Sequence, residues 1–167
     1  MDSYVHVDRI FAEHPGRITW LKDVGCQPIS WAFGKGIKSV SDLRRYLRTK
    51  RDTVHQIYQS GLPCFYLAGI HPRNIPPDLR REDIEDILEP YLEDDLCLGI
   101  GEIGLETGRN QEKEIFSAQL SMAQQVTQRG NLSTSFTTTR PLFSVFDQFG
   151  VACLSPLLDP NSLKLGG

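Results

Sequence analysis

Short runs of apolar and β-branched residues recur along the chain, separated by stretches with helical spacing. Four such runs predict β-strands, over residues 4–7, 28–33, 64–70 and 96–101. The last two runs are almost continuously apolar, as expected for strands that are buried on both faces of a sheet. The first strand should end at Asp8, and Pro28 should stand at the start of the second because proline cannot donate to a sheet.

Between and after these runs, apolar residues recur every three or four positions, which predicts amphipathic helices. The first helix should begin at a capping Ser41 and stop at Gly61. The second covers about residues 82–93, and Pro90 should end or kink it early. The third runs from Gln111 to about Gln128.

Buried strands that alternate with helices imply a parallel sheet and therefore an α/β fold. Roughly four strand–helix units are visible, which is half of the eight units in a parallel β/α (TIM-type) barrel of about 250 residues. The predicted fold is therefore an incomplete β/α barrel, comprising about its first half. A smaller, open doubly wound sheet fits the same alternation.

The composition narrows the class of protein without indicating a substrate. The 167 residues include 18 basic and 21 acidic side chains and are 40% hydrophobic, which is ordinary for a globular protein and excludes wholesale disorder. The net charge of −3 provides no strongly basic field for nucleic acid. No apolar stretch approaches the roughly 20 residues of a membrane helix. The N-terminus also lacks a signal-peptide pattern, so we expect a cytoplasmic protein without a membrane partner.

The four cysteines are widely spaced and form no CxxC pair. In a chain of this size without a secretion signal, this spacing favours reduced core thiols over disulfides or a four-cysteine zinc site. The cysteines are Cys26, Cys64, Cys97 and Cys153.

Charges and histidines are concentrated in the first three-quarters of the chain. Residues 127–167 carry only five charged side chains, and all four histidines lie before position 72. We therefore divide the chain into a partial barrel over residues 1–126 and a divergent or frame-altered segment over residues 127–167, which has no assignable motif. A variable surface segment is the alternative explanation for the second part.

The candidate chemistry lies where the predicted strands end. His6 closes the first strand, His71 follows the third and Glu102 follows the fourth. In a parallel barrel these positions converge on the face that carries active sites, and imidazole and carboxylate are ligands for zinc, manganese and similar ions. The structural alternatives are hydrogen-bonded histidines and a glutamate that accepts backbone N–H groups in a tight turn. A carboxylate on a buried strand is costly unless a cation or donors satisfy it, which favours a metal or catalytic role for Glu102.

Several ordered segments together resemble the TatD family of amidohydrolase-like metal-dependent hydrolases. The resemblance covers about residues 1–126, and its most specific parts are the Gly-Glu-Ile-Gly-Leu turn and the Gln-x-x-x-x-Phe-x-x-Gln-Leu helix. The segments are residues 2–8, 69–72, 101–105 and 111–120.

The resemblance implies a β/α barrel hydrolase that uses a divalent metal (Mg²⁺, Mn²⁺ or Zn²⁺), with deoxyribonuclease activity known in several members. DNA or a small phosphoester is the implied substrate. His6 matches the second histidine of the family's His-x-His pair, and Glu102 matches its metal-bridging, catalytic glutamate. His71 matches the histidine of the Gly-x-His-Pro turn, as a substrate-side or second-shell group. Asp8 matches an acidic residue whose role stays open.

The chain departs from the family at several ligand positions. Tyr4 stands where the family has the first histidine of the pair, and a neutral phenol is a poor metal ligand. No histidine follows His71, and neither Asp147 nor Asp159 lies in a version of the family's final aspartate motif. Only two ligands can be assigned, fewer than the three that hold a catalytic zinc.

Two interpretations follow from this incomplete ligand set. The first is a TatD-like hydrolase with impaired activity and a metal that the missing ligands leave unbound. The second is a non-catalytic pseudoenzyme or half-barrel that binds a partner. A half-barrel exposes sheet edges, which would favour self-association.

Overall fold

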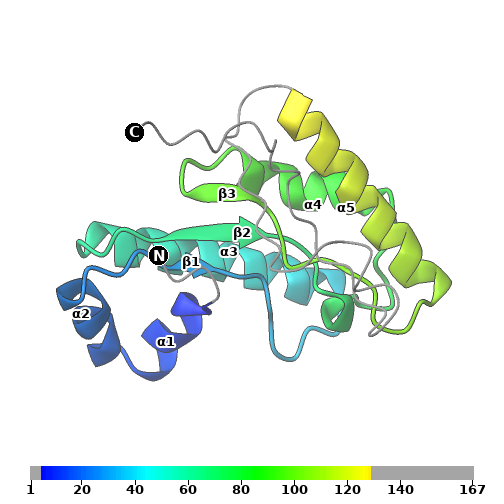
Figure 1. Cartoon of the computed structure of the whole chain (residues 1–167). Coiled ribbons are helices and arrows are strands. Elements are labelled where there is room, and N and C mark those ends of the chain that lie inside the picture. The colour runs from blue at the N-terminus through cyan, green and yellow to red at the C-terminus, as the bar shows by residue number, and fades with distance from the viewer. Residues whose placement is uncertain (1–4, 129–167) are drawn as a thin grey trace.

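The computed structural model describes residues 5–128, which form a parallel sheet with helices in every crossover (Figure 1). The sheet order is β1-β2-β3, and both strand pairs are parallel. The strands are β1 (Ile29–Ser30), β2 (Phe65–Ala68) and β3 (Cys97–Ile100). The predicted α/β class with a parallel sheet is therefore confirmed.

Two helices precede the sheet, one connects each pair of strands and one follows the last strand. They are α1 (Val7–Glu13), α2 (Gly16–Asp23), α3 (Val40–Gln59), α4 (Asp83–Leu92) and α5 (Asn110–Gln128), with a short 3-10 turn η1 (Pro72–Asn74) after β2. The three predicted helices are thus present as α3, α4 and α5, and their bounds differ from the prediction by one or two residues. None of the helices within residues 5–128 is both long enough and apolar enough to cross a membrane.

The first predicted strand, over residues 4–7, is largely wrong. Val5 makes one isolated parallel bridge to Ser30, and α1 already begins at Val7, with His6 at its N-cap. The backbone N–H groups of Arg9 and Ile10 donate to the His6 carbonyl, which closes the first helical turn. Val7 is fully buried as the first residue of this helix, so its apolar character reflects helix packing. Tyr4 lies outside the described residues.

Two helix-boundary predictions also need correction. Ser39 rather than Ser41 caps α3, because its side chain accepts the N–H of Asp42 at 3.1 Å. Pro90 lies inside α4, which continues to Leu92. Pro90 cannot donate to the carbonyl of Asp86 four residues earlier, and Arg44 of α3 donates to that carbonyl instead.

The sheet is buried on both faces, as its apolar runs predict. Tyr66 and Ala68 pack into the main core with residues of α3, α4 and α5, whereas Ile29, Trp31 and Leu67 form a separate cluster on the other face. Alternate residues of β2 therefore point to opposite layers.

The cysteines within the described residues are free thiols, as predicted. Cys64 and Cys97 are buried and Cys26 is partly buried, and burial raises the pKa of Cys64 to about 12 and that of Cys97 to about 11. Cys153 lies outside the described residues. The second predicted segment, residues 127–167, lies almost entirely outside them as well.

Candidate active site at the carboxyl ends of the strands

Three residues singled out from the sequence line one pocket of about 390 Å³: His6, His71 and Glu102. They come from three separate parts of the chain, the segment before α1 and the turns after β2 and β3. The other residues that line the pocket are Arg9, Phe33, Pro72, Arg73 and Glu106.

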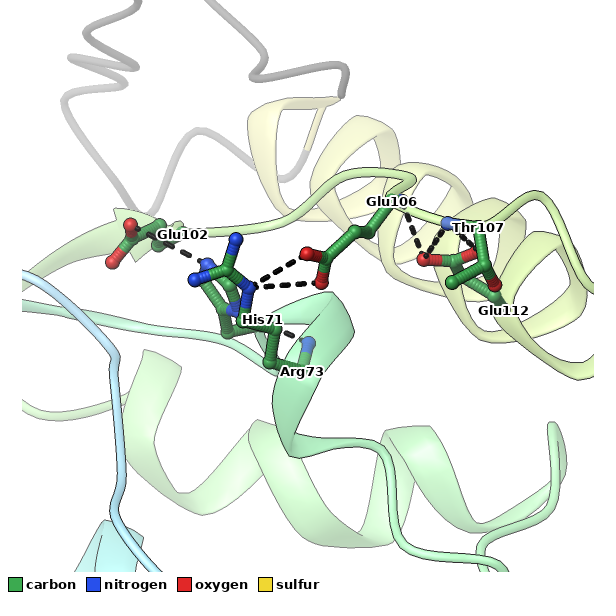
Figure 2. A network of polar contacts seen from close by, with 6 residues as sticks. All are labelled: His71, Arg73, Glu102, Glu106, Thr107 and Glu112. Atoms are coloured by element: carbon green, nitrogen blue, oxygen red, sulfur yellow. Dashed lines mark hydrogen bonds and ion pairs between the residues drawn. The ribbon is translucent and has the colours of Figure 1, made fainter. Parts of the chain in front are cut away.

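Two glycines let the ends of β2 and β3 approach closely enough to bring His71 and Glu102 together. A Cβ atom on Gly69 would lie 2.4 Å from the carbonyl oxygen of Gly101, and one on Gly101 would lie 2.8 Å from a methyl group of Leu67. Contacts this short are not tolerated against backbone, so Gly69 must lack a side chain. The resulting turns place Nε2 of His71 3.6 Å from Oε1 of Glu102 (Figure 2).

His6 is held in one tautomer by the backbone. Its Nδ1 lies 3.1 Å from the carbonyl oxygen of Trp31, which can only accept a hydrogen bond. Nδ1 therefore carries a proton, which in the neutral form of the ring leaves the lone pair on Nε2. Metal-binding histidines are typically oriented in this way, with the second ring nitrogen donating to a carbonyl or carboxylate.

His71 has the opposite tautomer. Its Nδ1 accepts the backbone N–H of Arg73 at 3.0 Å, so the proton of the neutral ring is on Nε2, which faces Glu102. Burial lowers the pKa of His71 to about 4, and the positive charge of Arg73 adds to this effect. His71 is therefore neutral at pH 7 and presents an N–H donor. The edge-to-face contact with Phe33, at 4.9 Å between ring centroids, fixes the plane of its ring.

Arg73 extends the polar network along the pocket rim, as Figure 2 shows. Its Nε lies 2.8 and 2.9 Å from the two carboxylate oxygens of Glu106. The loop that carries Glu106 is itself anchored, because Glu112 at the start of α5 accepts the backbone N–H groups of Glu106, Thr107 and Gly108. Burial opposes the charge of Glu112, but these hydrogen bonds prevail and lower its pKa. Arg73 is thus oriented by a carboxylate on a loop that Glu112 anchors.

Two buried amide side chains fix the backbone beneath the pocket. Gln119 of α5 accepts the N–H of Ile70 at 2.7 Å and donates to its carbonyl at 3.2 Å, immediately before His71. Asn74 makes the same pair of contacts with Gly34, next to Phe33. Gln119 belongs to the motif Gln-x-x-x-x-Phe-x-x-Gln-Leu, which by itself does not indicate this function. A polar residue on the buried stripe of a helix was the available signal.

Asp8 does not line the pocket. Its Oδ1 accepts the hydroxyl of Ser30 and lies 3.8 Å from Nζ of Lys50, a buried lysine that the sequence analysis missed. Lys50 falls at helical spacing within the buried stripe of α3, between Leu47 and Val54. A lysine in an otherwise apolar stripe was the signal that could have revealed it.

His6 and Glu102 are suitable ligands for a divalent metal, but they are only two ligands. An imidazole whose Nδ1 faces a backbone carbonyl, so that Nε2 is the ligand atom, and a carboxylate that is 12% exposed are donors that such ions accept. Within residues 5–128, however, no three His, Cys, Asp or Glu side chains gather in a group that could hold a metal ion. The described part of the chain therefore supplies a partial ligand set.

Two of three comparisons with known proteins give a match. The model of the family described as TatD related DNase matches residues 2–129. The solved structure of a TatD-like protein from Archaeoglobus fulgidus is similar, with a TM-score of 0.57 and 28% sequence identity. The match covers 75% of this chain and 52% of that protein, so the chain spans about half the length of its structural neighbour. The search of the curated proteins finds no match.

Proposed function

The chain belongs to the TatD-related DNase family, and on that premise we propose that its pocket is part of a metal-dependent site for hydrolysis of phosphodiester bonds. The substrate would be DNA or a small phosphoester. The observation that carries this proposal is the convergence of His6, His71 and Glu102 on one pocket from three separate parts of the chain. Active sites of β/α barrels are built in this way from the loops at the carboxyl ends of the strands.

The three residues take distinct roles in this proposal. Nε2 of His6 and the carboxylate of Glu102 would hold the metal, which when bound polarises a phosphate oxygen and activates water. His71 keeps its proton on Nε2 at pH 7, so it is a donor to Glu102 or to a substrate oxygen and not a metal ligand. This distribution of protons supports the substrate-side or second-shell role that the family resemblance implies.

Two arginines supply the charge that a phosphate group requires. Arg73 binds Glu106 through its Nε. In Figure 2 the rest of its guanidinium group is drawn between Glu106 and Glu102. Arg9 lines the same pocket from α1. A guanidinium already oriented by a carboxylate loses little entropy on binding phosphate, which makes Arg73 the preferred phosphate contact.

We further propose that the barrel and its ligand set are incomplete, so that the chain alone hydrolyses DNA poorly. By the family resemblance, Tyr4 stands at the position of a ligand histidine. Within residues 5–128 no group of three ligands forms, whereas a catalytic zinc uses three. A non-catalytic binding half-barrel is the second candidate. In the described sheet β3 pairs only with β2, and its other edge is a surface through which copies of the chain could associate.

Hydrolysis of DNA by the purified chain tests these proposals. With Mg²⁺ or Mn²⁺ we expect weak cleavage that falls at least roughly tenfold in Glu102→Gln, because the carboxylate ligand is lost. Glu114→Gln, an exposed position on α5, is the matched control and should leave the rate unchanged. Tyr4→His alone should not restore full activity, because other ligands remain missing.

The outcomes separate the alternatives. Cleavage that is insensitive to Glu102→Gln would refute the proposed site. Robust cleavage that Glu102→Gln abolishes would keep the site but refute the proposal that it is incomplete. Complete absence of metal-dependent cleavage, together with a concentration-dependent dimer in sedimentation, would favour the binding half-barrel.

A further inference from the structure

A buried lysine lies directly behind the candidate site, where α1, β1 and α3 pack together (Figure 1). Lys50 is 1% exposed, and its Nζ lies 2.6 Å from the carbonyl oxygen of Trp31 and 3.0 Å from Oγ of Ser30. Oδ1 of Asp8 is 3.8 Å away and accepts the Ser30 hydroxyl. Burying an ammonium group is costly unless it is paired and hydrogen-bonded, so this lysine depends on all three acceptors.

The Trp31 carbonyl connects the lysine to the candidate metal ligand. The same oxygen that accepts the Lys50 ammonium also accepts Nδ1–H of His6 at 3.1 Å. A backbone carbonyl has two lone pairs and can accept both donors. One backbone oxygen therefore lies between the buried charge and the imidazole that lines the pocket.

The lysine also connects two acceptors from different parts of the chain. Its Nζ lies 3.8 Å from Oδ1 of Asp8 and 2.6 Å from the carbonyl oxygen of Trp31, and the attraction of an ammonium group for both oxygens is strong in a buried region. Asp8 lies two residues after His6, at the start of α1. The backbone contacts that join this segment to the sheet are the Val5–Ser30 bridge and the hydrogen bond from Trp31 N–H to the Val5 carbonyl.

We infer that Lys50 is a positioning residue for His6. Its ammonium holds Asp8 and the Trp31 carbonyl at one point, and this fixes the segment that carries His6 against β1. The hydrogen bond from His6 to Trp31 then keeps the proton on Nδ1 and the lone pair on Nε2. The inference also assigns Asp8, which acts as the counterion of Lys50 rather than as a ligand. It rests on the proposed function only for the metal that Nε2 would bind.

Nitrogen-15 NMR of the histidine rings in the metal-free full-length chain tests this inference. In the wild type we expect His6, assigned by comparison with His6→Gln, to be protonated on Nδ1. In Lys50→Met, which has similar volume and no charge, we expect the Nε2–H tautomer to become populated at His6. His71 should keep its tautomer in the same spectra, because its partner is the N–H of Arg73. Lys113→Met, an exposed lysine of α5, is the control.

A second variant can be used if Lys50→Met does not fold. The double substitution Asp8→Asn and Lys50→Met removes both charges, so no unpaired carboxylate remains, and buried pairs replaced in this way often keep their fold. In any folded variant without the ammonium, we expect Mn²⁺ to bind at least about tenfold more weakly than to the wild type. Losses of this size are typical when a residue that supports a metal ligand is substituted.

The results that would overturn the inference are specific. A wild-type His6 protonated on Nε2 would refute it directly, as would an unchanged His6 tautomer in a folded variant that lacks Lys50. If the tautomer shifts but the wild type binds no Mn²⁺, Lys50 positions His6 as inferred and the proposed metal site fails. The tautomer therefore tests the positioning role, and the metal titration tests the function.

Discussion

Two clusters of opposite charges flank the candidate site, and they differ in their exposure to water. On the rim, the side chains of Arg73 and Glu106 are 64% and 33% exposed. Behind the site, the side chains of Lys50 and Asp8 are 0% and 11% exposed. Exposed pairs add little to stability, whereas a buried charge that loses its partner is strongly destabilising. The same type of interaction therefore orients the proposed phosphate contact in one region and should stabilise the fold in the other.

The largest effect should come from breaking the buried cluster. Asp8→Ala leaves the Lys50 ammonium without its carboxylate, and we expect the free energy of unfolding to fall by about 3–5 kcal/mol. Urea denaturation at pH 7 measures this change. Glu106→Ala on the rim should cost less than about 1 kcal/mol. Equal losses for the two substitutions would contradict the comparison.

The next largest loss of stability should come from changing a buried neutral side chain. Gln119→Leu removes both hydrogen bonds with the backbone of Ile70. The buried N–H and carbonyl of Ile70 then lose the side chain that they bind. We expect a loss of roughly 2–4 kcal/mol in the free energy of unfolding, since each unsatisfied buried group costs about 1–3 kcal/mol. Gln125→Leu, further along α5, is the control. A loss below that of Glu106→Ala would show that Gln119 does not hold the turn before His71.

The pH dependence of stability should distinguish the two clusters further. Burial lowers the pKa of Lys50 to about 8 from 10.5. Above pH 8 the unfolded chain therefore binds more protons at this residue than the folded chain, so stability rises with pH. Between pH 8 and 9 the gain should be about 1 kcal/mol relative to Lys50→Met, measured by urea denaturation.

The buried thiols act in the opposite direction at higher pH. Cys64 and Cys97 have raised pKa values, so above pH 9 the unfolded chain loses their protons first and stability falls. Comparison with Lys50→Met removes this contribution, because both chains keep the cysteines. Parallel stability curves for the two chains would mean that Lys50 does not titrate as its burial requires.

The smallest change in stability should follow a substitution on the rim. Arg73→Gln removes an exposed charge, and we expect the free energy of unfolding to change by no more than about 0.5 kcal/mol. The proposed metal-dependent cleavage of DNA should fall several-fold, because the proposed phosphate contact of Arg73 is lost. A marked loss of stability without a loss of cleavage would reverse the roles assigned to the two clusters.

The sequence predicts the sheet and its helices well where the apolar pattern is long. Residues 64–70 and 96–101 contain β2 and β3, and the stripes of α3, α4 and α5 fall at the predicted positions. The prediction failed for the segment around His6. A run of four residues can belong to a strand or to the start of a helix, and here the packing of Val7 and the contacts of Asp8 select the helix.

The sequence also predicts which chemical groups meet, but not how they are oriented. His71 and Glu102 line one pocket because they follow neighbouring parallel strands, whereas His6 reaches the pocket from the N-cap of α1, after the isolated bridge at Val5. The opposite tautomers of the two histidines depend on contacts with Trp31 O and Arg73 N, which no local pattern specifies. The role of Gln119 and the buried position of Lys50 were not predicted, because the partners of these polar residues, Ile70 and Ser30, are distant in the sequence.

The claim that His6 and Glu102 hold a divalent metal is tested most directly by Mn²⁺ titration of the chain labelled with nitrogen-15 in its histidines. Paramagnetic broadening falls steeply with distance, and the four histidines report on separate places. His6 and His71 line the pocket, His14 is exposed on the surface, and His55 pairs with Asp94. We expect the signals of His6 and His71 to broaden first, and Glu102→Gln to weaken this effect. Broadening that begins at His14 or His55, or that occurs at none of the four, would contradict the account.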